Sequence, residues 1–222
     1  THLHSDHVLE LGGLVHNAWT SGLRNKLSVY GPVGTKNIWT QFLKMLKVDI
    51  ETRVLDEGRP KLWDLISVHE YTEGTVIENL ELSVKALRTI HPPLRDCFAL
   101  SFIGAGTKIC FSGDTAFLMG LSEFARGAQI LVHEAMLEKG VAFVISKTGN
   151  TDERLYRHLT RSHTFARDVG RIANDAGVDL LVLNHLIPAE RDIADDKDWI
   201  EEVRHNFLGK VVVGSDGMHI PF

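Results

Sequence analysis

Four side chains that commonly bind metal ions lie within the first seven residues. They are His2, His4, Asp6 and His7, in the order His-x-His-x-Asp-His. On an extended segment alternate side chains share one face, so the first three are expected to converge, with His7 reaching the same centre from a following turn. Imidazole and carboxylate ligands suit zinc, manganese or iron. Because four ligands from one short segment crowd a single ion, the spacing favours two adjacent metal ions. A tag or surface metal trap is the alternative, and the interleaved Asp6 argues against it.

Three further candidate ligands lie where predicted strands end. His91 follows a strand predicted over residues 82–90, Asp114 follows one over 107–111, and His185 follows an apolar strand over 178–184. Polar residues at such positions often carry function. Taken singly, each has an ordinary structural explanation: His91 as a turn residue, Asp114 as a helix cap and His185 as the end of a strand. Their combination with the first cluster predicts a metal site.

The elements that position these residues predict an α/β fold. Strands are expected over 27–30, 65–71, 75–78, 82–90, 98–103, 107–111, 130–133, 178–184 and 210–213, and helices over 8–19 (interrupted at Gly12-Gly13), 35–47, 117–125, 164–176 and 198–207. Residues 137–162 are the least regular stretch. Early strands pair locally and later ones alternate with helices, so we expect two sheets with helices outside, in a layered sandwich. Thr35 is expected to cap its helix.

Composition is that of a globular chain and excludes several classes of protein. The 222 residues are 44% hydrophobic and 24% charged, with a formal net charge of −5. This charge argues against a broad nucleic-acid-binding surface. No apolar run is long enough to span a membrane, and no signal peptide is visible, so a cytoplasmic location is expected. We predict a single domain over residues 1–222. Because no strand precedes the first histidine cluster, we also expect that part of the N-terminus is missing.

The ordered ligand set resembles that of the metallo-β-lactamase superfamily. The resemblance spans nearly the whole chain and implies an αββα four-layer sandwich with a two-metal site. It implies that His2, His4 and His91 hold one metal, that Asp6, His7 and His185 hold the other, and that Asp114 bridges them.

Within that superfamily, three segments resemble the ribonuclease Z and arylsulfatase-like branch. They are Phe111-Ser112-Gly113-Asp114-Thr115, Leu131-Val132-His133-Glu134-Ala135 and Ser162-His163-Thr164. The last two match the ribonuclease Z segments only in part. The short interval from His91 to Asp114 leaves no room for the arm with which bacterial ribonuclease Z grips transfer RNA, so we expect no transfer RNA processing.

Roles for further residues follow from the resemblance and from side-chain chemistry. Asp6 is expected both to bind metal and to steer or accept the proton of the attacking water. His163 is the candidate proton donor on the leaving-group side, because imidazole titrates near neutral pH. His133 and Glu134 are interpreted as support for the ligands or as substrate contacts. The remaining histidines, His158 among them, have no comparable context and are taken as surface or packed residues.

A basic helical face is predicted between the segment that contains His133 and the segment that contains His163. Arg154, Arg157, His158 and Arg161 recur at helical spacing, with Leu155 and Leu159 on the other side. Such a face favours an anionic substrate, although a solvated surface is the simpler reading.

Together these features predict a dinuclear metal-dependent hydrolase of small esters. Phosphodiesters and aryl sulfates are favoured as substrates, and zinc as the metal, with manganese or iron as alternatives. The alternatives kept open are a lactonase or β-lactamase-like amide hydrolase, and a non-catalytic metal-binding scaffold. The expected partner is a small anionic molecule, with neither transfer RNA nor a membrane; self-association is left open.

Overall fold

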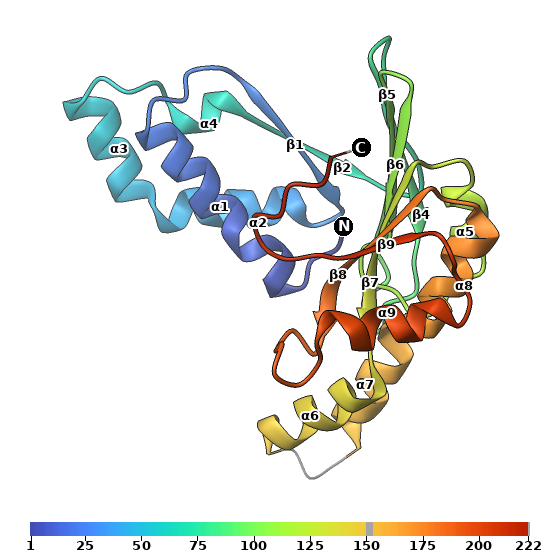
Figure 1. Ribbon diagram of the computed structural model, residues 1–222. Helices are drawn as coiled ribbons and strands as arrows, with labels where there is room; N and C mark the ends of the chain where they lie inside the picture. The colour runs from blue at the N-terminus through green and yellow to red at the C-terminus, as the bar shows by residue number, and fades with distance from the viewer. Residues whose placement is uncertain (150–152, 222) are drawn as a thin grey trace. The chain divides into compact units, whose positions relative to one another are not determined.

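The computed structural model describes residues 1–149 and 153–221 (Figure 1). It divides into two compact units, residues 1–72 and 73–222. Each unit has its own strands, helices and apolar core. The single domain expected over residues 1–222 stays a prediction.

The first unit is mainly helical. It contains α1 (Ser5–Thr20), β1 (Leu27–Pro32), α2 (Thr35–Met45), α3 (Lys47–Asp56), α4 (Leu62–Leu65) and β2 (Ile66–Tyr71). β1 and β2 pair in parallel. Trp19, Trp39 and Ile50 are buried in one cluster, which brings α1, α2 and α3 together around shared apolar surface. Burial of such side chains is the main stabilising contribution in a unit of this size.

Two sequence expectations for the first unit were wrong. α1 runs without interruption from Ser5 to Thr20, across Gly12 and Gly13. A Cβ on Gly12 would lie 2.1 Å from Phe42 Cδ2, so this glycine permits close helix packing and does not end the helix. At α2 the N-cap position belongs to Gly34, and the Thr35 hydroxyl donates to Pro32 O over 2.7 Å instead of capping the helix.

The second unit is built on one sheet in the spatial order β3-β4-β5-β6-β7-β8-β9. Its strands are β3 (Gly74–Glu78), β4 (Leu82–Arg88), β5 (Phe98–Gly104), β6 (Thr107–Phe111), β7 (Ile130–Met136), β8 (Leu180–Ile187) and β9 (Lys210–Val213). The pairs from β3 to β6 are antiparallel, and the pairs from β6 to β9 are parallel. The order matches the predicted change from local hairpins to helix-connected strands.

Three helices cover one face of this sheet: α5 (Gly120–Ala125), α8 (Ala166–Ala176) and α9 (Asp196–Arg204) (Figure 1). Their buried residues Leu121, Val169 and Trp199 share a core with Leu181 and Leu183 of β8. α5 and α9 are shorter than the helices predicted over 117–125 and 198–207. α9 starts earlier than predicted because Asp195 and Asp198 form a capping box at its N-terminus.

The described part of residues 137–162, which leaves out 150–152, is more regular than predicted. It contains α6 (Glu138–Thr148) and α7 (Arg154–Ser162), which pack against each other. The prediction of irregular structure was wrong. The apolar residues of α6 and α7 form a separate small cluster with Met136, so the sequence shows no single long amphipathic stripe. The helical face predicted over residues 154–161 is confirmed.

None of the helices in the described residues combines the length and the apolar character that crossing a membrane requires.

Candidate metal centre

The candidate site of the second unit lies at one edge of its sheet. The pairing directions make β4, β6, β7 and β8 run the same way, so their carboxyl ends share this edge. His91 follows β4, Asp114 follows β6, and Glu134 and His185 lie near the ends of β7 and β8. Ligands of α/β sheets commonly bind at such carboxyl ends. The topology therefore explains how residues nearly a hundred positions apart meet.

Asp114 is the centre of this cluster. Its carboxylate is 4% exposed, and Oδ2 lies 3.3 Å from His185 Nε2 and 3.8 Å from His91 Nε2. His163 joins them, since His91, Asp114 and His163 each offer a ligand atom within 4.8 Å of the others. The structure thus brings together the three ligands predicted in this unit, and it adds His163, which was predicted as a proton donor.

His185 reaches the cluster through a bulge in β8. Glu134 pairs with Asn184 and Ala135 pairs with Leu186, so His185 is the extra residue of the β8 strand. Its φ of 43° lies in the left-handed region, which residues other than glycine rarely adopt. Bulges redirect side chains beside functional sites. The strand predicted to end at residue 184 therefore continues to Ile187. His185 lies within it, at the bulge, in a strained backbone conformation.

His163 is held by a buried carboxyl group. Its Nδ1 lies 3.0 Å from Glu134 Oε1, and the same oxygen accepts a hydrogen bond from Thr115 N over 2.9 Å. Burial, and then the nearby Asp114 carboxylate, raise the pKa of Glu134 well above its usual range. With Nδ1 engaged, Nε2 is the His163 nitrogen through which the ring can act on a substrate.

The end of α7 is joined to the loop that carries His91. His91 Nδ1 lies 2.8 Å from the Ser162 carbonyl oxygen, and the Ser162 hydroxyl donates to Pro92 O over 2.9 Å. A carbonyl partner at Nδ1 fixes the ring with Nε2 as the ligand nitrogen. No role for Ser162 could be predicted from the sequence, because its contacts lie about seventy residues away along the chain.

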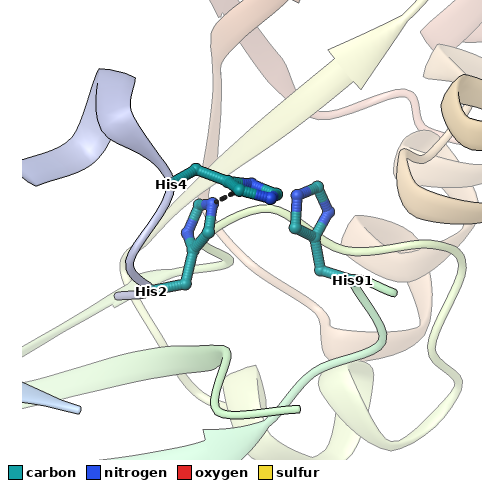
Figure 2. Close-up of side chains that lie close together, drawn as sticks. All are labelled: His2, His4 and His91. Carbon is teal, nitrogen blue, oxygen red and sulfur yellow. Dashed lines mark hydrogen bonds between the residues drawn. The ribbon is translucent and has the colours of Figure 1, made fainter. Parts of the chain in front are cut away.

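The first unit contains a histidine cluster of its own. His2 Nε2 and His4 Nδ1 lie 3.1 Å apart in a hydrogen bond, which Figure 2 shows as a dashed line. The His7 ring lies 4.0 Å from the His2 ring, and His7 Nε2 lies 3.4 Å from Asp6 Oδ2. α1 already begins at Ser5, so Asp6 and His7 sit in its first turn. The extended segment predicted to include Asp6 was therefore wrong beyond His4.

His133 and Glu134 face opposite sides of the sheet. Successive strand residues alternate faces, and His133 pairs with Leu183, which belongs to the core beneath α8 and α9. His133 is fully buried, and its Nε2 has no hydrogen-bond partner among the described residues. Burial lowers the pKa of His133 to about 4. His133 thus lies on the core side of the sheet, and its role as support for the ligands or as a substrate contact stays a prediction. Glu134 is the member of the pair whose carboxyl group contacts His163.

The predicted basic face lies on α7. Arg154, Arg157 and Arg161 are exposed, and we call these three the α7 arginines. His158 is half-buried, and its ring centroid lies 6.1 Å from that of His91 and 6.3 Å from that of His163. The sequence predicts only an ordinary surface or packed histidine at position 158, and the structure places it beside His91 and His163. Its position on the same helical face, five residues before His163, was the signal available.

The donor set of the second unit fits divalent metal ions. A buried carboxylate is costly unless it is paired or coordinates a cation, and Asp114 is surrounded by imidazoles of His91, His163 and His185. Imidazole and carboxylate together suit zinc, manganese and iron. The same ligand types recur in the cluster of His2, His4, Asp6 and His7.

Solved structures place this architecture in a known fold. The chain aligns with the metallo-β-lactamase fold protein YhfI from Bacillus subtilis at a TM-score of 0.66 and 20% identity, covering 98% of this chain and 74% of that one. It aligns with Zn²⁺-bound PqqB from Methylobacterium extorquens at a TM-score of 0.61 and 15% identity, covering 100% of this chain and 69% of that one. The fold and the histidine–aspartate clusters define a metal-dependent hydrolase of the α/β metallo-β-lactamase fold, as the sequence predicted.

Sequence comparison then identifies the family. Residues 1–150 match the family model described as Anti-Pycsar protein Apyc1. The ribonuclease Z of Mycobacterium marinum is 30% identical over 220 residues, covering 97% of this chain and 76% of the relative. The chain belongs to the Anti-Pycsar protein Apyc1 family, within the metallo-β-lactamase-fold proteins related to ribonuclease Z.

Proposed function

We propose that the chain hydrolyses a small anionic ester, with a phosphodiester preferred over an aryl sulfate. The observation that carries this proposal is the attachment of α7 to the candidate metal centre. Ser162 joins α7 to the His91 loop, and His163 joins its C-terminal end to Glu134. A helix bearing three exposed arginines is thereby fixed beside a histidine–aspartate cluster, and guanidinium groups bind phosphate and sulfate oxygens well.

The proposed centre is dinuclear, with zinc as the preferred metal. Its proposed ligands are His2, His4, Asp6 and His7 from the first unit and His91, Asp114 and His185 from the second. The family relationship and the donor chemistry support this set. When bound, two such ions lower the pKa of a water molecule and polarise the ester. The presence of zinc in a protein of the same fold supports that choice of metal.

The chain's own residues supply proton transfer and orientation. Asp6 is assigned to steer the attacking water and to accept its proton at the carboxylate. His163 donates a proton from Nε2 to the leaving oxygen, while Glu134 holds Nδ1 and fixes the ring plane. His91 keeps its ligand nitrogen in place through Ser162 O.

A substrate panel tests the proposal. The metal-loaded protein is assayed with bis(4-nitrophenyl) phosphate, 4-nitrophenyl sulfate, a neutral lactone, a β-lactam and a transfer RNA precursor, before and after chelation. Chelator-sensitive hydrolysis of the phosphodiester, above all other substrates, is expected. Preference for the lactone or β-lactam would favour the amide or lactone hydrolase, and preference for the precursor would favour the activity that the name of the relatives indicates. Stoichiometric metal with no turnover of any substrate would favour a scaffold.

A further inference from the structure

Thr115 connects the loop that carries Asp114 to the loop that carries His91. It follows Asp114 directly in the chain and is fully buried. Its hydroxyl accepts a hydrogen bond from Ile90 N over 3.2 Å and donates one to Ala116 O over 2.7 Å. Because Ile90 directly precedes His91, this one side chain links the backbones beside two proposed metal ligands.

A second threonine links the same two loops from the other side. Thr89 is also buried, and its hydroxyl donates to the Asp114 carbonyl oxygen over 3.1 Å. The backbones pair between the two threonines, since Ala116 N donates to Ile90 O over 2.7 Å. Two of these three links therefore depend on a threonine hydroxyl.

Thr115 also reaches the His163 side of the site, but through its backbone. Its N–H donates to Glu134 Oε1, the oxygen that contacts His163 Nδ1. Its carbonyl oxygen accepts a hydrogen bond from the Thr164 hydroxyl over 2.7 Å. These backbone groups remain when the side chain is replaced. The effect of the Thr115 hydroxyl on the His91 loop can therefore be measured separately.

The spacing of the two loops decides whether His91 and Asp114 can bind the same ion. His91 Nε2 lies 3.8 Å from Asp114 Oδ2. Zinc holds nitrogen and oxygen ligands at about 2.0–2.2 Å, so a small shift of either loop takes one ligand out of reach. The contact of His91 Nδ1 with Ser162 O orients the ring. The threonine hydroxyls act on a different quantity, the distance between the loops.

We propose that Thr115 and Thr89 are positioning residues, whose hydroxyls hold His91 and Asp114 at the spacing needed to share one divalent metal ion. This inference rests on the proposed function, which assigns both residues as metal ligands. The hydroxyls act on the ligands through the backbone of the two loops. Contacts that orient metal ligands in this way commonly change metal affinity by about 10–100-fold.

The test compares Thr115→Val, which removes the hydroxyl at similar shape, with Thr115→Ser, which keeps it. Zinc affinity is measured on the whole chain by competition with a chromogenic chelator. It should weaken about 10–100-fold in Thr115→Val and stay within about threefold of the wild type in Thr115→Ser. Thr89→Val should weaken zinc binding in the same direction.

The matched control is Ser122→Ala. Ser122 is a buried residue of α5 whose hydroxyl donates to Met119 O over 2.8 Å, so the variant loses a hydrogen bond of the same kind. Its zinc affinity should equal that of the wild type. The visible absorption of the cobalt-loaded protein reports ligand geometry. It should change in Thr115→Val and stay unchanged in Thr115→Ser and Ser122→Ala, which a general loss of stability would not produce.

Zinc affinity of Thr115→Val within about twofold of the wild type, or equal losses in Thr115→Val and Thr115→Ser, would overturn the inference. If Thr115→Val does not fold, Thr89→Val is judged against the wild type by the same criteria. None of these measurements requires ester hydrolysis. Normal zinc binding with no ester hydrolysed would thus contradict the proposed function alone, whereas a wild-type chain that binds no zinc would contradict both.

Discussion

Replacing His133 by leucine should make the protein less sensitive to acid. His133 is fully buried beside Leu183, and burial lowers its pKa from 6.5 to about 4. The unfolded chain therefore takes up a proton at this residue near pH 6.5, whereas the folded chain does so only near pH 4. Between these values the unfolded state binds more protons, so stability is present in full above this window and is lost as the pH falls through it.

The two pKa values set the size of the effect. Their separation corresponds to about 3 kcal/mol over the whole window, and about 2 kcal/mol of that is lost between pH 7 and pH 5. His133→Leu removes this titration. At pH 7 the variant loses the contact between His133 Nδ1 and Glu134 O but also removes a buried Nε2 that has no partner among the described residues. These changes oppose each other, so the two proteins should differ little in free energy of unfolding at pH 7, compared with the change in that difference at pH 5.

Urea unfolding of both proteins at pH 7 and pH 5, in the same metal-free buffer, measures the effect. The stability of His133→Leu relative to the wild type should rise by about 2 kcal/mol on going to pH 5. Leu183→Val is the control, because it removes packing on the same sheet face and should cost about 1 kcal/mol at both pH values. Titrations shared by all three proteins cancel in the differences. An equal difference between wild type and His133→Leu at the two pH values would refute the reasoning.

Three further predictions concern the site. Asp114→Ala should remove activity and lower metal content, since the carboxylate contacts imidazoles on two sides; full metal content with near-normal turnover would contradict its assignment as the bridging ligand. His163→Ala should keep stoichiometric metal but slow turnover by about 10²–10⁴-fold, and loss of metal would instead make His163 a ligand. Changing the α7 arginines together to glutamine should raise KM for an anionic ester with kcat nearly unchanged, an effect that shrinks at high salt as exposed charges are screened. Equal losses on a neutral ester would show that these arginines serve folding.

Much of the fold could be predicted because its signals are local. The strands predicted over 98–103 and 107–111 pair as β5 and β6, and the Gly104-Ala105-Gly106 turn between them is a hairpin signal that lies within a few residues of sequence. Cys97 and Cys110 are free, buried thiols, and Cys110 pairs with Ser101 in that hairpin. The candidate ligands His91 and Asp114 were identified for a similar reason, since each follows a strand that the pattern predicted.

The features that could not be predicted from the sequence depend on contacts between residues that are far apart along the chain. The bulge at His185 arises from the pairing of β7 with β8, and the site contacts of Ser162 and His158 arise where α7 meets the His91 loop. None of these pairings is encoded within a local window. The separation of His133 from Glu134 was predictable, because adjacent residues of one strand cannot both face the site.

The hydrogen bond between the His91 ring and the Ser162 carbonyl also affects the C-terminal end of helix α7. Ser162 is the last residue of α7, and the carbonyls in the last turn of a helix lack partners within it. His91 Nδ1, 2.8 Å from the Ser162 carbonyl, therefore acts as a C-terminal cap supplied from a distant loop. Fraying of α7 and release of the imidazole are then one equilibrium. Whatever holds the ring in place also protects the helix end from opening, and by reciprocity a more stable α7 holds the ring in its ligand orientation.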